Sequence, residues 1–418
     1  MGFVSPTFTY GWRRSGDRAT APAAGRRWET VRLSLGSAQE VGGTDDNEEP
    51  FLESTWNRRD FLSMGAGLGA AGLGLPDQAD ARFLGDIFKG EGKDVFQRTS
   101  FIYDVDQFGL KEVSFGDALS RLAKKNVVLL GDHKNSLADH LLSARLIKEL
   151  KLRRGKVAVA LQEVQGRFQP ALESYIQGRI GEDKLYKVTQ WKNRSTVPFD
   201  NFLGIFWICR RYNIPMIAAN AETEVLDKVR SSGLQALSQL ERRRTVVDPE
   251  GFAKSLNDIR FPSYEKAVIA PTFNILSGKG LLGKQPDPKN YFSSRILCDE
   301  AIATNIALFM QQHPDTLVIA VMNNDRIKYE LGVPDRVLRV ANSVGVNNVE
   351  LGSVLLNLTT SEAGVDPRTN SLRTSYEVIT GDPEMPSTFL RLCDMIWYAN
   401  PANLNAEPGR KRSGSLLF

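Results

Sequence analysis

Five near-continuous apolar runs of strand length are the feature that most constrains the fold of this 418-residue chain. Each run is rich in Val, Ile, Leu and Ala, and four of them lead directly into a polar cluster. Strands that are apolar on both sides are typical of a parallel sheet with both faces covered. The runs are Asn126–Leu130, Lys156–Leu161, Ile214–Ala219, Thr316–Met322 and Leu351–Leu356.

Helical patterns, with apolar residues at spacings of three and four, lie between the apolar runs. They cover Ser136–Leu152, Phe168–Gln177, Phe199–Tyr212 and Ile296–Gln312. This alternation predicts an α/β fold with a mostly parallel central sheet and helices on both faces, in three layers. The Gly-, Pro- and Lys-rich stretch Pro271–Tyr291 is predicted to be a long loop that could lie over a cleft.

The polar clusters predict where a ligand would bind. Ligands of open parallel sheets bind beyond the carboxyl ends of the strands, and the clusters follow those ends. We therefore expect a cleft lined by Asp132, Lys134, Glu163, Asn220, Asn323, Asn324 and Arg326.

Composition argues against several classes of protein. The three cysteines form no CxxC pair and lie in apolar runs, so buried thiols are expected rather than a zinc site. Only three histidines are present, which restricts any metal site. The formal net charge is +4, and no Lys/Arg run is interleaved with aromatic residues, so nucleic acid is not an expected partner.

The first 81 residues resemble a two-part targeting signal. Residues 1–56 are predicted to be a plastid transit peptide, because they are rich in Ala, Ser, Thr, Gly and Arg. Residues 57–81 contain Arg58-Arg59, a short apolar stretch and an A-x-A cleavage pattern, like a twin-arginine thylakoid transfer signal. The apolar stretch is far shorter than the roughly 20 residues that span a bilayer. We expect a mature domain of residues 82–418 in the thylakoid lumen, without a transmembrane anchor.

Several motifs in the predicted domain resemble the ChaN-like haem-binding family of the Tiki superfamily. Val159–Gly178 reads VALQEVQGRFQPALESYIQG, with a Glu after the strand followed by F-Q-P-A-L-x-x-Y, as in that family. Further resembling stretches are Thr189–Trp191, Ile214–Ala221, Cys298–Ala303, Tyr329–Pro334 and Asp394–Tyr398. The resemblance runs in order from about residue 100 to about residue 402, which implies one domain rather than two.

Two departures from the family pattern affect the expected chemistry. Lys134 stands where the family motif G-E-x-H has its His, and Arg326 stands where G-x-G-H has its His. Glu163 matches the motif carboxylate, and His140 matches a His that often begins the following helix. Lys and Arg are protonated at pH 7 and repel a metal cation, which disfavours a Tiki-like metal-dependent hydrolase. A binding protein is therefore favoured over an enzyme.

The resemblance implies haem, or another tetrapyrrole, as the cofactor. Lys134 and Arg326 could pair with the propionates, and Tyr329, His133 or His140 could hold the iron. The other expected binding residues are Asp132, Glu163, Asn220 and Asn324. The resemblance also implies a homodimer with haem at its interface.

Structural explanations stay open beside each of these assignments. Lys134 and Glu163 could form a buried ion pair, Tyr329 could pack with a solvated hydroxyl, and His140 could be a surface or cap residue. Asp299 and Glu300 are expected to stabilise a helix N-terminus. The protein could then be a degenerate, ligand-free scaffold, and the sequence does not separate haem from chlorophyll derivatives.

Overall fold

A computed structural model describes residues 100–106, 109–366, 371–379 and 387–399. The predicted transit peptide and twin-arginine signal lie outside the described residues, so their assignment stays a prediction. Within the described parts of the chain, no helix is both long and apolar enough to cross a bilayer.

Eight strands form one central sheet, whose inner part is parallel. The strands are β1 (Ser100–Val105), β2 (Leu110–Glu112), β3 (Val127–Asp132), β4 (Val157–Gln165), β5 (Met216–Asn220), β6 (Leu317–Asn323), β7 (Leu351–Leu356) and β12 (Met395–Ala399). Their order is β2-β1-β12-β7-β3-β6-β4-β5. The six strands from β12 to β5 run parallel, and β1 and β2 are antiparallel additions at one edge. The predicted mostly parallel sheet is confirmed.

Both faces of the sheet are buried, which explains the continuous apolar runs. All six residues of β3 are buried. Successive residues of a strand point to opposite faces, and Val128 and Leu130 join one core cluster while Val127 and Leu129 join the other. A strand that packs on both sides has no position for an exposed polar side chain. This is why a simple alternation of apolar and polar residues is missing from the sequence.

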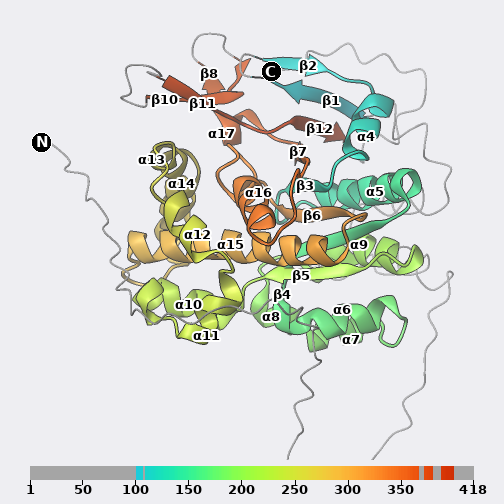
Figure 1. The fold of residues 1–418 in the computed structure, drawn as a ribbon, viewed down its shortest axis with the longest axis horizontal. Coiled ribbons are helices and arrows are strands. Elements are labelled where there is room, and N and C mark those ends of the chain that lie inside the picture. Colours follow the sequence, from blue (N-terminus) through green and yellow to red (C-terminus); the bar gives the residue numbers. More distant parts are fainter. Residues whose placement is uncertain (1–99, 107–108, 367–370, 380–386, 400–418) are drawn as a thin grey trace, which may run out of the picture. The chain divides into compact units, whose positions relative to one another are not determined.

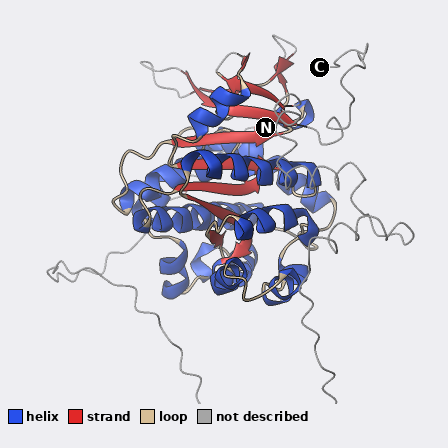
Figure 2. Cartoon of the chain, turned by 90° about the vertical axis from the view of Figure 1, so that its right-hand side faces the viewer, coloured by secondary structure: helices blue, strands red, loops and turns tan. Residues whose placement is uncertain are grey.

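Helices cover each face of the sheet (Figure 1, Figure 2). The helices α4 (Phe115–Leu122), α5 (Leu137–Arg154), α6 (Gln169–Ile176) and α9 (Phe199–Arg211) contribute to the first core cluster. The helices α10 (Thr223–Ser232), α15 (Pro288–Gln312) and α16 (Val333–Ser343) contribute to the second. Ser136 caps α5, because its side chain accepts a hydrogen bond from the Asp139 N–H at 3.2 Å.

The prediction of a long loop over Pro271–Tyr291 is wrong. Helix α14 spans Ala270–Gly278, and α15 already begins at Pro288, behind an Asp287 cap. Proline is tolerated in the first turn of a helix, where its missing N–H would have no partner. Pro288 therefore marks the start of α15, whereas Pro271 lies where the π-helical residues Glu265–Ile269 run directly into α14, and Pro286 precedes the Asp287 cap.

Shorter elements complete the described fold. They are α7 (Glu182–Val188), α8 (Trp191–Arg194), α11 (Gln239–Thr245), α12 (Pro249–Ser255), α13 (Phe261–Tyr264), α17 (Thr360–Ala363), the paired strands β8 (Val365–Asp366) and β9 (Ser371–Leu372), and the hairpin of β10 (Ser375–Ile379) and β11 (Ser387–Arg391). Four single turns are η1 (Gly166–Phe168), η2 (Leu234–Ala236), the π-helical η3 (Glu265–Ile269) and η4 (Asn324–Arg326).

Candidate functional site

The polar residues that follow the strands lie at one edge of the sheet. Asp132 at the end of β3 is in register with Asn323 at the end of β6, and η4 follows immediately. A Cβ at Gly131 would lie 3.0 Å from the Cα of Asn324 and 2.7 Å from Leu355 Cδ2. Glycine at this position therefore allows the turn after β6 to fold against β3.

His133 is held between two carboxylates. Its Nδ1 lies 2.5 Å from Asp139 Oδ2, and its Nε2 lies 2.7 Å from Glu362 Oε2. Asn324 Nδ2 is 3.2 Å from the same Nε2 and donates to Glu362 Oε1 at 3.1 Å. The hydrogen bonds to Asp139 and then to Glu362 raise the pKa of His133 to about 10. His133 is therefore an imidazolium with both nitrogens engaged, which leaves no lone pair for an iron.

His140 and Asp132 form a second buried pair. His140 is 1% exposed, so the alternative of a surface histidine is wrong. Its Nδ1 donates to the Ser136 carbonyl at 2.7 Å, and its ring packs 4.5 Å from that of Phe202. Its Nε2 lies 3.4 Å from Asp132 Oδ2 and has no hydrogen-bond partner among the described residues. Burial raises the pKa of Asp132 to about 6, although the nearby His140 acts in the opposite direction.

Arg326 is ion-paired inside the protein. Its guanidinium donates to Asp299, which also accepts from Arg295 at 3.2 Å. The Nε of Arg326 is buried and has no hydrogen-bond partner in the described structure. The expectation that Asp299 lies at a helix N-terminus is wrong, because α15 begins eleven positions earlier at Pro288. Glu300 is likewise buried inside α15, where it accepts from Arg339 at 2.5 Å.

Lys134 is half-buried and has no hydrogen bond or ion pair to any described residue. The predicted alternative, an ion pair with Glu163, does not form. Glu163 instead accepts hydrogen bonds from Ser195 at 2.7 Å and from Gln162 at 3.3 Å.

The end of β5 joins this region through a thiol. Asn220 accepts a hydrogen bond from Cys298 of α15 at 3.1 Å. Burial raises the pKa of Cys298, and the positive charges of Arg326 and Lys134 oppose that shift. Both cations therefore lie within electrostatic range of one thiol, and the structure gathers residues from β3, β5, η4 and α15.

The side chain of Tyr329 contacts α17 and β10. It is 3% exposed, its ring packs against Tyr376 at 5.4 Å, and its hydroxyl lies 3.4 Å from the Ala363 carbonyl. Its φ of +60° is in the left-handed region, and its N–H donates to Leu392 at 2.9 Å. Burial raises the pKa of Tyr329, which disfavours the phenolate that binds iron.

Sequence reasoning missed Tyr291, in the first turns of α15. Its ring packs 5.2 Å from that of Phe273 in α14, and its hydroxyl forms no hydrogen bond with a described residue. Burial raises the pKa of Tyr291, while Arg295 and Arg326 lower it. The sequence does not single out Tyr291 as a site residue, because Tyr291 lies in the stretch predicted to be a loop.

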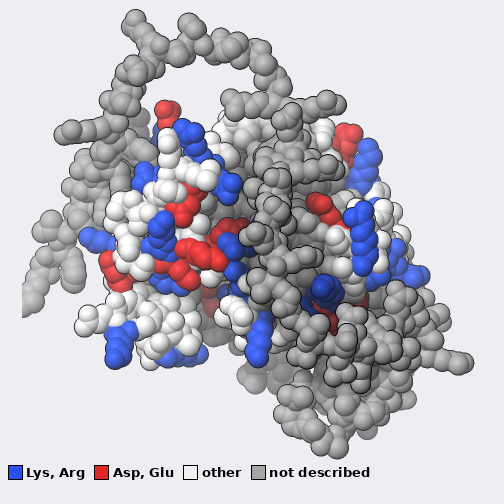
Figure 3. All heavy atoms as spheres, turned by 90° about the horizontal axis from the view of Figure 1, so that it is seen from below, with Lys and Arg blue, Asp and Glu red and all other residues white. Residues whose placement is uncertain are grey.

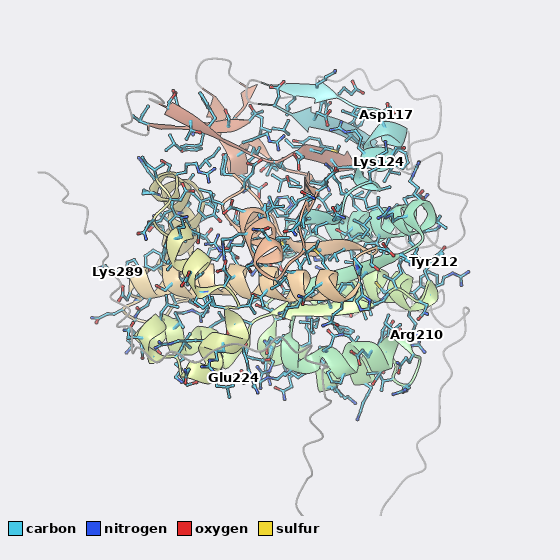
Figure 4. The ribbon with its side chains drawn as sticks, viewed as in Figure 1. Asp117, Lys124, Arg210, Tyr212, Glu224 and Lys289 are labelled. Atoms are coloured by element: carbon cyan, nitrogen blue, oxygen red, sulfur yellow. The ribbon has the colours of Figure 1, made fainter. Side chains whose placement is uncertain are left out.

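A further group of charges, after β4 and at the start of α10, is paired internally. Arg167 and Arg194 both bind Glu224, at 2.8 Å and 2.7 Å, and Arg194 also donates to Gln165 at the end of β4. Figure 4 labels Glu224 at the lower side of the molecule, and basic and acidic side chains are interspersed on the face that Figure 3 shows. Among the residues that the structure describes, no three His, Cys, Asp or Glu side chains are grouped to hold a metal ion.

The fold and this edge define an α/β protein whose charged and polar groups meet at the carboxyl ends of a parallel sheet. Residues 118–337 match the family described as haem-binding uptake, Tiki superfamily, ChaN. The match covers more than half of the chain, and the protein belongs to this family.

Solved structures with a similar fold are distant in sequence. One, described as cofacial haem binding to ChaN of Campylobacter jejuni, is 15% identical, with a TM-score of 0.45, over 72% of this chain and 97% of that one. The type III effector HopBA1 is 10% identical, with a TM-score of 0.36, over 68% and 91%. An erythromycin esterase, EreC, is 12% identical, with a TM-score of 0.35, over 71% and 97%. No curated protein matches the chain significantly.

Proposed function

We propose that this protein binds haem, or a related tetrapyrrole, at the carboxyl edge of its sheet. Membership of a haem-binding family supports the ligand class. The observation that carries the proposal is a half-buried cation near the ion-paired Arg326. Lys134 has no hydrogen bond or ion pair to a described residue. Arg326 is bound to Asp299, and only its buried Nε lacks an acceptor among the described residues. Haem carries two carboxylates, which ammonium and guanidinium groups bind by charge-assisted hydrogen bonds.

Tyr291 is the iron ligand that this geometry favours. Its hydroxyl forms no hydrogen bond with a described residue, and Tyr291 lies within electrostatic range of Arg326. His133, His140 and Tyr329, by contrast, are engaged or buried. Tyrosinate is an established haem ligand. Burial raises the pKa of Tyr291, as it does that of Tyr329, and the guanidinium groups of Arg295 and Arg326 oppose that shift. Bound haem would supply an iron centre, and we propose that the protein carries haem rather than acting as an enzyme.

Haemin titration of the full chain, followed in the Soret band, tests the proposal. We expect a saturable shift in the native protein. Tyr291→Phe should change the position of the band and weaken binding by about tenfold or more, because the iron loses its ligand. Tyr329→Phe is the matched control, since it removes the same hydroxyl from a residue that packs against Tyr376.

Lys134→Ala tests the carboxylate contact separately. Loss of one charge-assisted hydrogen bond should weaken haemin binding by about tenfold without moving the Soret band. A folded native protein that gives no saturable shift would contradict the proposal and favour the ligand-free scaffold. The ion pair between Arg326 and Asp299 is the observation on the side of that second candidate. A loss of binding in Tyr329→Phe alone would return the ligand role to Tyr329.

For location, we propose the thylakoid lumen, with the homodimer implied by the family resemblance as a further prediction. The twin arginines Arg58 and Arg59, after a transit-like segment, support a twin-arginine route. Replacing both with Lys should leave import into isolated chloroplasts unchanged and stop transfer into thylakoids. Unchanged transfer would contradict this route.

A further inference from the structure

Helix α14 is apolar, yet none of its residues is buried. Its inner contacts come from Thr272, whose hydroxyl donates to Asp325 at 3.1 Å, and from Phe273, which packs on Tyr291. Ile275 remains 57% exposed, and Leu281, just beyond the helix, is 67% exposed. An apolar helix of a globular domain normally turns a stripe of side chains into the core. The outward-facing apolar side chains of this segment are therefore exposed to water, although burial would be more favourable.

The exposed charges nearest Ile275 and Leu281 in the sequence are lysines, and the acids Glu265 and Asp287 bound this segment. Residues 266–286 contain three lysines and no acidic residue, and all three lysines are exposed. Lys279 and Lys284 flank Leu281, and Lys279 follows Ile275 by four positions, the spacing that brings helical side chains together. Neither lysine has an ion pair or hydrogen bond within the described structure. We call residues 275–284 the α14 tip.

Exposed apolar side chains rimmed by lysines match the chemistry of a bilayer surface with anionic lipids. The apolar groups enter the boundary between headgroups and acyl chains, and the lysines contact the negative headgroups. A symmetric contact between two copies fits less well, because it would bring Lys279 and Lys284 of one copy against the same cations of the other.

We propose that the α14 tip docks this protein reversibly on an anionic lipid bilayer. Ile275 and Leu281 enter the interface, and Lys279 and Lys284 bind lipid headgroups. The docking does not depend on haem, because these four side chains lie outside the haem contacts proposed above. Two apolar side chains and a few lysines give weak binding, so the protein exchanges between membrane and solution.

Vesicle co-sedimentation of the full chain, without haemin, tests the proposal. We expect binding to vesicles of phosphatidylglycerol mixed with phosphatidylcholine, and little binding to phosphatidylcholine alone. Leu281→Glu should weaken binding to the anionic vesicles by about tenfold or more. It removes an apolar side chain that enters the bilayer and adds a negative charge that the headgroups repel. Lys279→Gln should weaken it by about fivefold and reduce its dependence on salt.

Leu152→Glu is the matched control. Leu152 of α5 is 61% exposed, similar to Leu281, and Figure 1 shows α5 and α14 on opposite sides of the domain. The N-terminal segment is the same in every variant, so its contribution to vesicle binding cancels. Equal binding of Leu281→Glu and Leu152→Glu would overturn the proposal. If Leu281→Glu instead dissociated a dimer and left vesicle binding unchanged, the tip would be a contact between copies, which also overturns it.

Discussion

Neutralising His133 should remove a stabilisation that depends on pH. The folded-state pKa of about 10 lies above the ordinary value of 6.5, because Asp139 and then Glu362 hold the ring as a cation. A group with a raised folded-state pKa contributes stability that is fully present below the unfolded pKa. That contribution is lost as the pH rises through the folded pKa. The affected window therefore runs from about pH 6.5 to about pH 10.

The size of the effect follows from the shift. At pH 7 the folded-state pKa of His133 lies about three units above the pH, and each unit corresponds to about 1.4 kcal/mol of stabilisation of the folded protein. The His133 side chain is 29% exposed, so water screens part of this, and we expect about 3 kcal/mol. Asp139 is 1% exposed at its side chain, which places the stronger of the two contacts out of water.

Urea unfolding of the native chain and of His133→Asn, at several pH values, measures this contribution. The native chain should exceed the variant by about 3 kcal/mol near pH 7, and the two should converge near pH 10. His313→Asn, at an exposed histidine, is the control and should show little difference at any pH. A constant gap between native and His133→Asn across this range would refute the reasoning, because it would mean that His133 contributes packing rather than charge.

Two further changes probe the same edge of the sheet. The pKa of Asp132 is raised by burial from 3.8 to about 6, so the native state holds the proton more tightly than the unfolded chain, and stability falls as pH rises through that window. Asp132→Asn should remove this slope and raise the unfolding free energy near pH 7 by up to about 3 kcal/mol, measured by urea unfolding. Asp299→Ala should destabilise the protein by about 3–5 kcal/mol, because it leaves Arg295 and Arg326 without their shared acid. Asp315→Ala, at an 81% exposed carboxylate, should cost less than about 1 kcal/mol in the same assay.

The inner strands could be predicted because burial on both faces leaves a strong pattern. The run Leu351–Leu356 coincides with β7, and the other four runs differ from β3, β4, β5 and β6 only at their ends. The antiparallel strand β1 was not found by pattern, because its six residues mix buried, half-buried and exposed positions. Helix α14 was missed because it buries none of its residues, so the apolar periodicity that marks other helices is absent.

The site was predictable in part. Topology brings the residues after parallel strands to one edge, and so the gathering of Asp132, Asn220 and Arg326 followed from the pattern. Their partners did not. The carboxylate that binds His133 Nε2 belongs to Glu362, 229 positions later, and the acid that binds Arg326 lies inside α15. The spacing of residues in the sequence does not predict such pairs, because the packing of helices against the sheet determines which side chains meet.

The place of β12 determines when the chain can complete its fold. This strand is the last that the structure describes, yet it lies between β7 and β1 instead of at an edge. Ser100 of β1 is in register with Ala399 of β12. The first described strand therefore cannot join the sheet until the last one has been synthesised. During translation the β1–β2 hairpin therefore has no sheet to join, and the edge of β7 stays open until the ribosome has synthesised β12, which ends at Ala399. A premature stop before Met395 would release a protein in which the β1–β2 hairpin and the edge of β7 are both unpaired. Chaperones and proteases would recognise such a protein.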